Sequence, residues 1–244
     1  MRDPCDLLAW DTAFWGMPIA RVSGNALAPA DLPAIDRWCA RHAVACLFLL
    51  APCDDAALLA AARAAGFVET DRRITLEQRL AGPGAPPSPA IRLATPEDIP
   101  RLRPIAAASH EETRFFADAR FPRDRARELY ATWIERSVGG FADAVLVWDD
   151  GGRPVGYVTL HDEPGAVRIG LLAVDANERG RGIGRALVEA GLAWARERGA
   201  DRASLVTQGR NAAARSLYAA TGFSTRECAI WLHRWGSANG EGTG

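Results

Sequence analysis

The sequence predicts an α/β protein with two domains, and three observations support this prediction. An apolar stretch, Ile169–Val174, runs into a glycine-rich turn that opens directly into a helix-like segment, Arg185–Arg198. Segments with strand and helix character alternate between residues 19 and 80. Between these regions, residues 81–90 are rich in proline and glycine and have no hydrophobic period, which is typical of a linker.

The predicted elements follow in order along each domain. The smaller domain, residues 1–80, should contain strand Ile19–Val22, helix Leu32–His42, strand Val44–Leu50, helix Ala56–Ala65 and strand Val68–Leu80. The larger domain, residues 91–235, should contain strands Val155–Leu160 and Ile169–Val174, helix Arg185–Arg198, strand Ala203–Thr207 and a helix from Asn211 that Gly222 ends. Residues 236–244 are glycine-rich, and we expect them to form a flexible tail.

The turn between strand and helix has the features of an anion site. Its residues are Arg179, Gly180, Arg181, Gly182, Ile183 and Gly184. A helix that starts here directs free N–H groups and the positive end of its dipole at one point. The glycines let the backbone curl around a phosphate, and the guanidinium groups of Arg179, Arg181 and Arg185 can pair with its oxygens. The turn therefore predicts phosphate binding.

Spacing excludes two better-known phosphate loops. The dinucleotide fingerprint G-x-G-x-x-G fails because Arg185 or Leu187 occupies its last position, and the G-x-x-x-x-G-K-[ST] loop needs a lysine, which this sequence lacks. What remains is R-x-x-G-x-G, formed by Arg179, Gly182 and Gly184, which resembles the pyrophosphate-binding turn of the GNAT superfamily of acyl-CoA-dependent N-acyltransferases. A glycine-rich β–α connection with exposed arginines is the alternative that six residues leave open.

The resemblance extends along the larger domain and implies a mixed central sheet flanked by helices, with acetyl-CoA as the acyl donor. Leu172, Ala173 and Val174 stand where the family's strand binds the pantetheine arm and an N–H polarises the thioester carbonyl. Asn211 matches an asparagine that contacts the cofactor, and Tyr218 matches a tyrosine that faces the thiolate. The resemblance thus implies that residues 172–174, the turn from Arg179 to Arg185, and Asn211 bind the cofactor.

Chemistry explains a tyrosine at that position. Attack of an amine on the thioester expels a thiolate, and a phenol with a pKa of about 10 is a suitable proton source for it. We therefore interpret Tyr218 as the general acid. The alternative is that Tyr218, one of three tyrosines, only packs a helix face.

The first segment resembles a narrower group. Trp10-Asp-Thr-Ala-Phe-Trp-Gly16 is similar to the W-D-x-x-F-F-G start of the dTDP-fucosamine N-acetyltransferases, which implies that the acceptor is the amine of a nucleotide-activated amino sugar such as dTDP-4-amino-4,6-dideoxygalactose. Gly66-Phe67 resembles Gly222-Phe223. When the two segments are aligned on these glycines, Ala62 occupies the position of Tyr218. The smaller domain therefore resembles a truncated GNAT half without a cofactor site, although two alanine-rich helices can also look alike by chance.

This resemblance also supplies substrate-binding candidates. A nucleotide sugar brings a second pyrophosphate, so an arginine outside the turn is expected near it, and Arg114 is the candidate, with Phe115 beside it. The aromatic residues that could stack on the sugar or base are Phe14, Trp15, Phe116, Phe121, Tyr130 and Trp133. A solvated surface charge and ordinary core aromatics are the alternatives.

A general base must deprotonate the acceptor amine. Asp71 is the candidate, because the narrower group carries an acidic residue at its position, and the base would act through ordered water. The rivals are Asp11, Glu111 and Glu112, and His110 is a possible secondary base in the acceptor region.

Composition bounds the remaining possibilities. The net charge of -1 provides no broad field for nucleic acid, and no apolar run is long enough for a membrane span. The first ten residues carry charges, so we expect no secretory signal and a cytoplasmic protein. The five cysteines are scattered and are expected to be small core residues rather than disulfides or zinc ligands, and we predict no metal.

Three questions stay open at the level of sequence. The acceptor amine could instead belong to a protein N-terminus, an antibiotic or a small amine. The chain could be a non-catalytic CoA-binding module, although Tyr218 and the complete turn argue against that. Edge strands and apolar helix faces commonly pair in such folds, which makes a homodimer a candidate assembly that no residue decides.

Overall fold

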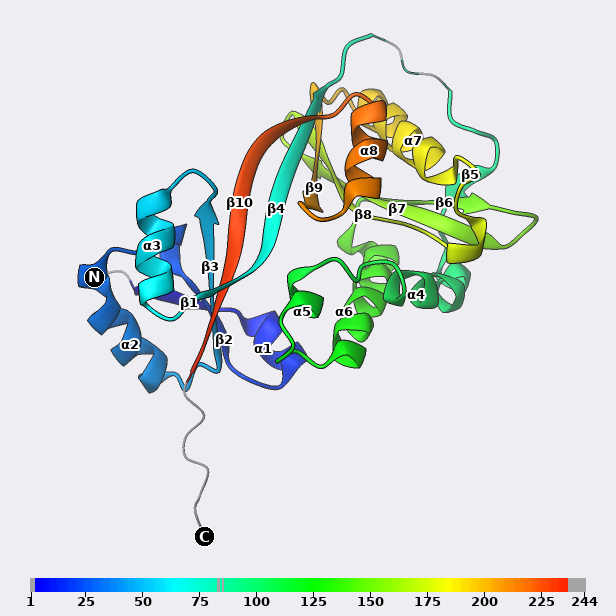
Figure 1. Cartoon of the computed structure of the whole chain (residues 1–244). Coiled ribbons are helices and arrows are strands. Elements are labelled where there is room, and N and C mark those ends of the chain that lie inside the picture. The colour runs from blue at the N-terminus through cyan, green and yellow to red at the C-terminus, as the bar shows by residue number, and fades with distance from the viewer. Residues whose placement is uncertain (1–2, 83, 85, 237–244) are drawn as a thin grey trace. The chain divides into compact units, whose positions relative to one another are not determined.

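The computed structural model describes residues 3–82, 84 and 86–236, and it divides into two compact units (Figure 1). Unit 1 comprises Met1–Arg73 and Cys228–Gly244, and unit 2 comprises Ile74–Glu227. The chain passes between the units inside strands β4 and β10, not at the predicted linker 81–90. A strand that continues through a boundary leaves no composition signal there. Residues 83 and 85 of that linker, and the predicted tail beyond Gly236, lie outside the described residues.

Unit 1 is built from β-strands and α-helices. Its elements are β1 (Cys5–Leu7), α1 (Ala9–Trp15), β2 (Ile19–Val22), α2 (Leu32–Arg41), β3 (Cys46–Pro52), α3 (Ala56–Ala64), the first part of β4 (Val68–Arg79) and most of β10 (Ser224–Trp235). Strand β2 pairs antiparallel with β1 and parallel with β3, and β10 pairs antiparallel with β3. Strand β3 reads Cys-Leu-Phe-Leu-Leu-Ala-Pro, and its nearly continuous burial is typical of a central strand.

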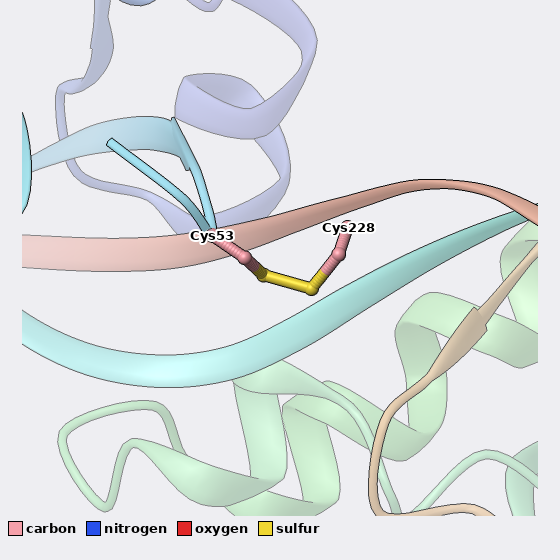
Figure 2. The surroundings of a disulfide bond; sticks show 2 residues. All are labelled: Cys53 and Cys228. Carbon is pink, nitrogen blue, oxygen red and sulfur yellow. A yellow bond between two sulfur atoms is a disulfide. The ribbon is translucent and has the colours of Figure 1, made fainter. Parts of the chain in front are cut away.

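A disulfide joins Cys53 to Cys228 within unit 1 (Figure 2). Cys53 directly follows β3 and Cys228 lies in β10, where the Cys53 N–H donates to the Cys228 carbonyl at 3.0 Å. Strand pairing thus brings the two Cα atoms to 5.4 Å, although 175 positions separate the residues in sequence. The prediction that the cysteines stay unpaired is therefore wrong for this pair, because it could not anticipate that β10 returns beside β3.

Thiol counting checks this pairing. Cys5, Cys39 and Cys46 are free, so denatured, unreduced protein should titrate three thiols and reduced protein five. Replacing both Cys53 and Cys228 by serine should lower the free energy of unfolding by about 2–4 kcal/mol, because the crosslink restricts the unfolded chain. Chemical denaturation measures the loss, and five thiols before reduction would contradict the disulfide.

Unit 2 contains a mixed sheet with helices. Its elements are the end of β4, β5 (Ile91–Leu93), α4 (Ile99–Ala107), α5 (Arg114–Ala117), α6 (Arg123–Arg136), β6 (Ala144–Asp149), β7 (Pro154–Glu163), β8 (Ala166–Val174), α7 (Ile183–Glu197), β9 (Arg202–Gln208), α8 (Ala212–Ala220) and the start of β10. Strands β5 to β8 form antiparallel pairs in chain order, and β9 joins β8 in parallel. The expected mixed α/β sheet flanked by helices is confirmed.

Two neighbouring residues of β7 show how both faces of this sheet are covered. A Cβ on Gly156 would lie 3.1 Å from the Leu187 side chain of α7, so this glycine lets the helix pack close to the strand. The next side chain, Tyr157, points to the opposite face because side chains alternate along a strand. Figure 1 shows α7 and α8 on one side of β6–β8 and α4 and α6 on the other.

Helices α3 and α8 begin and end alike. The residues before them, Asp55 and Asn211, each accept a hydrogen bond from the backbone N–H three positions later, at 2.9 and 3.0 Å. Gly66 and Gly222 follow the helices with φ of 83° and 93°, a left-handed conformation that favours glycine. The sequence echo therefore reflects the same local structure in both units, and the resemblance of the N-terminal segment to a truncated GNAT half stays a prediction.

Candidate active site

A cavity of about 790 Å³ lies in unit 2 where several element ends meet. Its wall combines the loop after α4, two aromatic residues of α6, the end of β8, the turn before α7, the end of β9 and one side of α8. The lining residues are 108–113, Tyr130, Trp133, 170–174, 178–180, 182–185, 206–208, Asn211, Ala213, Ala214, Leu217 and Tyr218. The structure thus brings together most of the residues that the sequence assigned to the cofactor.

The cavity opens where β8 separates from β9. The two strands pair over Ala166–Ile169 only, whereas β8 continues to Val174. Leu171 N–H donates to Thr159 Oγ1 at 2.7 Å and thus points to β7. Because successive N–H groups along a strand point in opposite lateral directions, Leu172 N–H points away from β7 and toward the opening. The free edge of β8 can therefore hydrogen-bond an extended ligand.

A bulge in β8 produces this arrangement, and Gly170 permits it. The register between β7 and β8 shifts between Val158 and Leu160, so Thr159 lies opposite two residues of β8. A Cβ on Gly170 would lie 2.7 Å from Thr159 Oγ1 and 2.8 Å from His161 Nε2. No larger side chain fits there without displacing its neighbours, so the bulge depends on this glycine.

The glycine-rich turn directs the start of α7 at the cavity. Gly180 and Gly182 have φ of 81° and 79°, and Ile183 begins a helix of 15 residues. The first N–H groups of a helix have no partners within it, and the helix dipole adds positive potential at the same place. This arrangement suits an anion, and phosphate binding by the turn stays a prediction.

The three arginines of the turn have different surroundings. Arg179 lines the cavity and donates from Nε to the Val174 carbonyl at 3.2 Å, and Arg185 also lines it. The Arg181 side chain instead pairs with Glu178 and with Asp150. The structure therefore places the Arg181 side chain outside the cavity wall, because two carboxylates hold it, although sequence assigned it to the phosphate.

Helix α8 contributes the two predicted polar residues on the other side of the opening. Asn211 lines the cavity while its amide oxygen caps the helix. Tyr218 is 7% exposed, and its ring packs edge-on against Phe223. Desolvation raises the pKa of Tyr218 to about 12, so its phenol stays protonated at any physiological pH.

A second polar group lines the cavity on the side of α4 and α6. His110 Nε2 lies 3.3 Å from Tyr157 Oη, and the imidazole stacks on the Tyr130 ring at 4.6 Å. Tyr130 Oη in turn donates to Thr113 Oγ1 at 2.8 Å. Although His110 reaches the cavity, protein surrounds its ring, and this desolvation lowers the pKa of His110 to about 4. Nothing in the sequence around Tyr157 indicated that it supports this histidine.

The predicted substrate residues of helix α5 lie elsewhere. Phe115 is 3% exposed and packs edge-on against Phe121 in the core. The Arg114 guanidinium stacks on the Phe115 ring at 4.5 Å, and neither residue lines the cavity. Core packing occupies the Phe115 ring, and contacts of Arg114 and Phe115 with the substrate stay predictions.

The remaining predicted residues belong to unit 1. Phe14 contacts Trp15 edge-on, and both lie partly exposed in α1. Asp71 lies in β4 and is 6% exposed. The cavity wall is made of unit 2 residues, so substrate contacts by Phe14 and Trp15 and base catalysis by Asp71 stay predictions.

Within residues 3–82, 84 and 86–236, no group of three or more His, Cys, Asp or Glu side chains is arranged to hold a metal ion. None of the helices that the structure describes combines the length and the apolar character needed to cross a bilayer.

Comparisons with known proteins identify the family. The acetyltransferase (GNAT) family model matches residues 105–223, which include the whole cavity wall from Ala108 to Tyr218. The dTDP-fucosamine acetyltransferase of Escherichia coli O6:H1 is 32% identical over 96% of this chain and 99% of its own length. A mycothiol acetyltransferase of Beutenbergia cavernae is 36% identical over 61% of this chain, which spans only 54% of that relative.

A solved structure supports the fold independently. The GCN5-related N-acetyltransferase from Sphaerobacter thermophilus superimposes with a TM-score of 0.64 at 17% identity, covering 95% of this chain and 76% of that one. At this identity the likeness concerns the fold alone. Together with the nearly full-length match at 32% identity, it shows that the chain belongs to the acetyltransferase (GNAT) family and is an N-acetyltransferase.

Proposed function

We propose that this enzyme transfers an acetyl group directly from acetyl-CoA to the amine of a nucleotide-activated amino sugar similar to dTDP-4-amino-4,6-dideoxygalactose. The observation that carries the proposal is one cavity that combines an anion-binding helix start, a free strand edge and a buried phenol. Direct transfer needs no nucleophile from the enzyme, because holding the amine beside the thioester supplies most of the advantage.

The donor side of the cavity suits coenzyme A. Its diphosphate would bind the N–H groups at the start of α7, with Arg179 and Arg185 nearby. Its pantetheine arm would add to the free edge of β8, and Leu172 N–H would stabilise the oxyanion that forms at the thioester carbonyl. In this arrangement the thiolate leaves toward Tyr218, which protonates it.

The acceptor class rests on the full-length similarity. A relative that matches 96% of this chain over 99% of its own length is named for dTDP-fucosamine. The cavity wall opposite α8 adds the aromatic rings of Tyr130 and Trp133, which suit a sugar ring, and the carboxylates of Glu111 and Glu112.

Release of CoA thiol across a panel of acceptors tests the proposal. The panel contains dTDP- and UDP-amino sugars, with spermidine and a peptide as controls. We expect release with a nucleotide-linked amino sugar and none with the controls. Release with the peptide alone would overturn the proposed acceptor while leaving the N-acetyltransferase assignment intact.

A second acceptor is supported by a specific finding. The mycothiol acetyltransferase of Beutenbergia cavernae is 36% identical to this chain over 162 residues. The acceptor of that enzyme therefore belongs in the panel. If this chain acetylated that acceptor faster than every nucleotide sugar of the panel, that acceptor would be the substrate.

The arginines of the turn offer a matched pair of variants. Arg179→Ala should weaken acetyl-CoA binding about tenfold, because it removes a charge-assisted contact to the diphosphate. Arg181→Ala should change binding less than about twofold, since Glu178 and Asp150 hold that side chain on the protein surface. Calorimetry measures both dissociation constants. Equal losses in the two variants would refute the distinction.

A further inference from the structure

The imidazole of His110 is held in the cavity wall by groups that the proposed donor site does not use. Tyr157 contacts Nε2 from the sheet, and the Tyr130 ring stacks on one face. Nδ1 makes no hydrogen bond to any residue that the structure describes. A neutral imidazole has one donor nitrogen and one acceptor nitrogen. In the tautomer whose Nε2–H donates to Tyr157 Oη, Nδ1 keeps its lone pair, and this is the tautomer that can accept a proton at Nδ1.

Its surroundings hold the ring in place without adding charge. Tyr157 is fully buried at 0% exposure and Tyr130 is 4% exposed, so both rings are fixed by the core. Thr113 accepts from the Tyr130 hydroxyl and itself donates to the His110 carbonyl at 3.3 Å, which closes a small network around the loop. This network fixes both the main chain and the side chain of His110.

We propose that His110 Nδ1 accepts the proton that the acceptor amine loses during acetyl transfer; this rests on the proposed function. The amine nitrogen bonds to the thioester carbonyl carbon, and the C–S bond then breaks. The amine proton passes to Nδ1, and the departing thiolate takes the Tyr218 proton. His110 releases its proton to solvent and Tyr218 regains one, so the enzyme returns to its initial state.

The charge of the ring suits this role. The phenols of Tyr157 and Tyr130 face the imidazole from β7 and α6. Glu111 and Glu112 follow His110 on its own loop, and Arg127 of α6 pairs with Glu111. Desolvation alone accounts for its lowered pKa of about 4, so the ring is neutral and able to accept a proton at pH 7. Nitrogen becomes far more acidic once it is bonded to the tetrahedral carbon, which favours transfer to this weakly basic ring.

A histidine pair provides the test variant and its control. His110→Gln keeps a polar side chain of similar size but cannot carry the proton. His42→Gln alters an exposed histidine of unit 1 that does not line the cavity. With the best acceptor of the panel, His110→Gln should lower kcat by about 10²–10⁴ and leave acetyl-CoA binding within about twofold, whereas His42→Gln should change neither.

The pH profile separates proton transfer from mere support of the loop. Wild-type kcat should stay level from pH 8 to about pH 5 and fall below it as His110 becomes protonated. Tyr157→Phe should move this acidic limb, because it removes the partner of Nε2. A His110→Gln enzyme that binds acetyl-CoA and keeps kcat within about threefold would overturn the proposal, as would an acidic limb that disappears in Asp71→Asn but persists in His110→Gln. Acetylation of a panel amine by the wild type tests the proposed function separately.

Discussion

Replacing Tyr218 by phenylalanine should lower kcat by about 10²–10⁴ while the affinity for acetyl-CoA hardly changes. The variant keeps the ring that packs against Phe223 and loses only the hydroxyl. Without that hydroxyl the thiolate must leave unprotonated or take its proton from water. The rate of the chemical step therefore falls, whereas cofactor binding does not change. Steady-state kinetics give kcat, and calorimetry with acetyl-CoA shows whether the cavity is intact.

The raised pKa of Tyr218 adds a second readout to this experiment. A general acid acts in its protonated form, and burial raises the pKa of this phenol to about 12. Deprotonation of Tyr218 therefore should not reduce wild-type kcat below about pH 11. A wild-type kcat that falls near pH 9 only while Tyr218 is present, or an unchanged kcat in Tyr218→Phe, would remove this residue from the proposed mechanism.

Local patterns in the sequence were enough to predict the elements that carry the donor side of the site. The predicted strand Ile19–Val22 matches β2, and the predicted helix Leu32–His42 differs from α2 by one residue. In the turn, left-handed glycines and a helix start lie next to each other in the chain, so their role follows from neighbouring residues alone. For the same reason Asn211 was placed correctly at the start of its helix.

Contacts between distant segments could not be predicted in this way. The Cys53–Cys228 disulfide depends on the return of β10 beside β3, and the environment of His110 depends on Tyr157 from another strand. Arg181 looked equivalent to Arg179 because sequence gives charge but not the carboxylates that neutralise it. Thus the sequence indicated which residues could react, whereas tertiary contacts determine which of them reach the cavity.

Replacing Gly182 by alanine should weaken acetyl-CoA binding about 10- to 100-fold. Gly182 precedes α7 with φ of 79°, lines the cavity, and a Cβ there would meet no protein atom within 4 Å. The added methyl group would thus occupy cavity space or force the turn to relax from its left-handed conformation. Either change displaces N–H donors from the diphosphate, and each charge-assisted bond contributes about 1.5–3 kcal/mol. Calorimetry measures the loss.

Gly199 at the other end of α7 provides the matched control. It has φ of 71°, and a Cβ on it would also meet no protein atom within 4 Å. Gly199→Ala should therefore cost the same roughly 1–2 kcal/mol of conformational strain, which thermal unfolding measures, but it should leave the acetyl-CoA dissociation constant unchanged. Equal effects of the two variants on binding would mean that strain in α7, rather than the anion site at its start, accounts for the loss. A loss confined to Gly182→Ala would localise the diphosphate to the start of this helix.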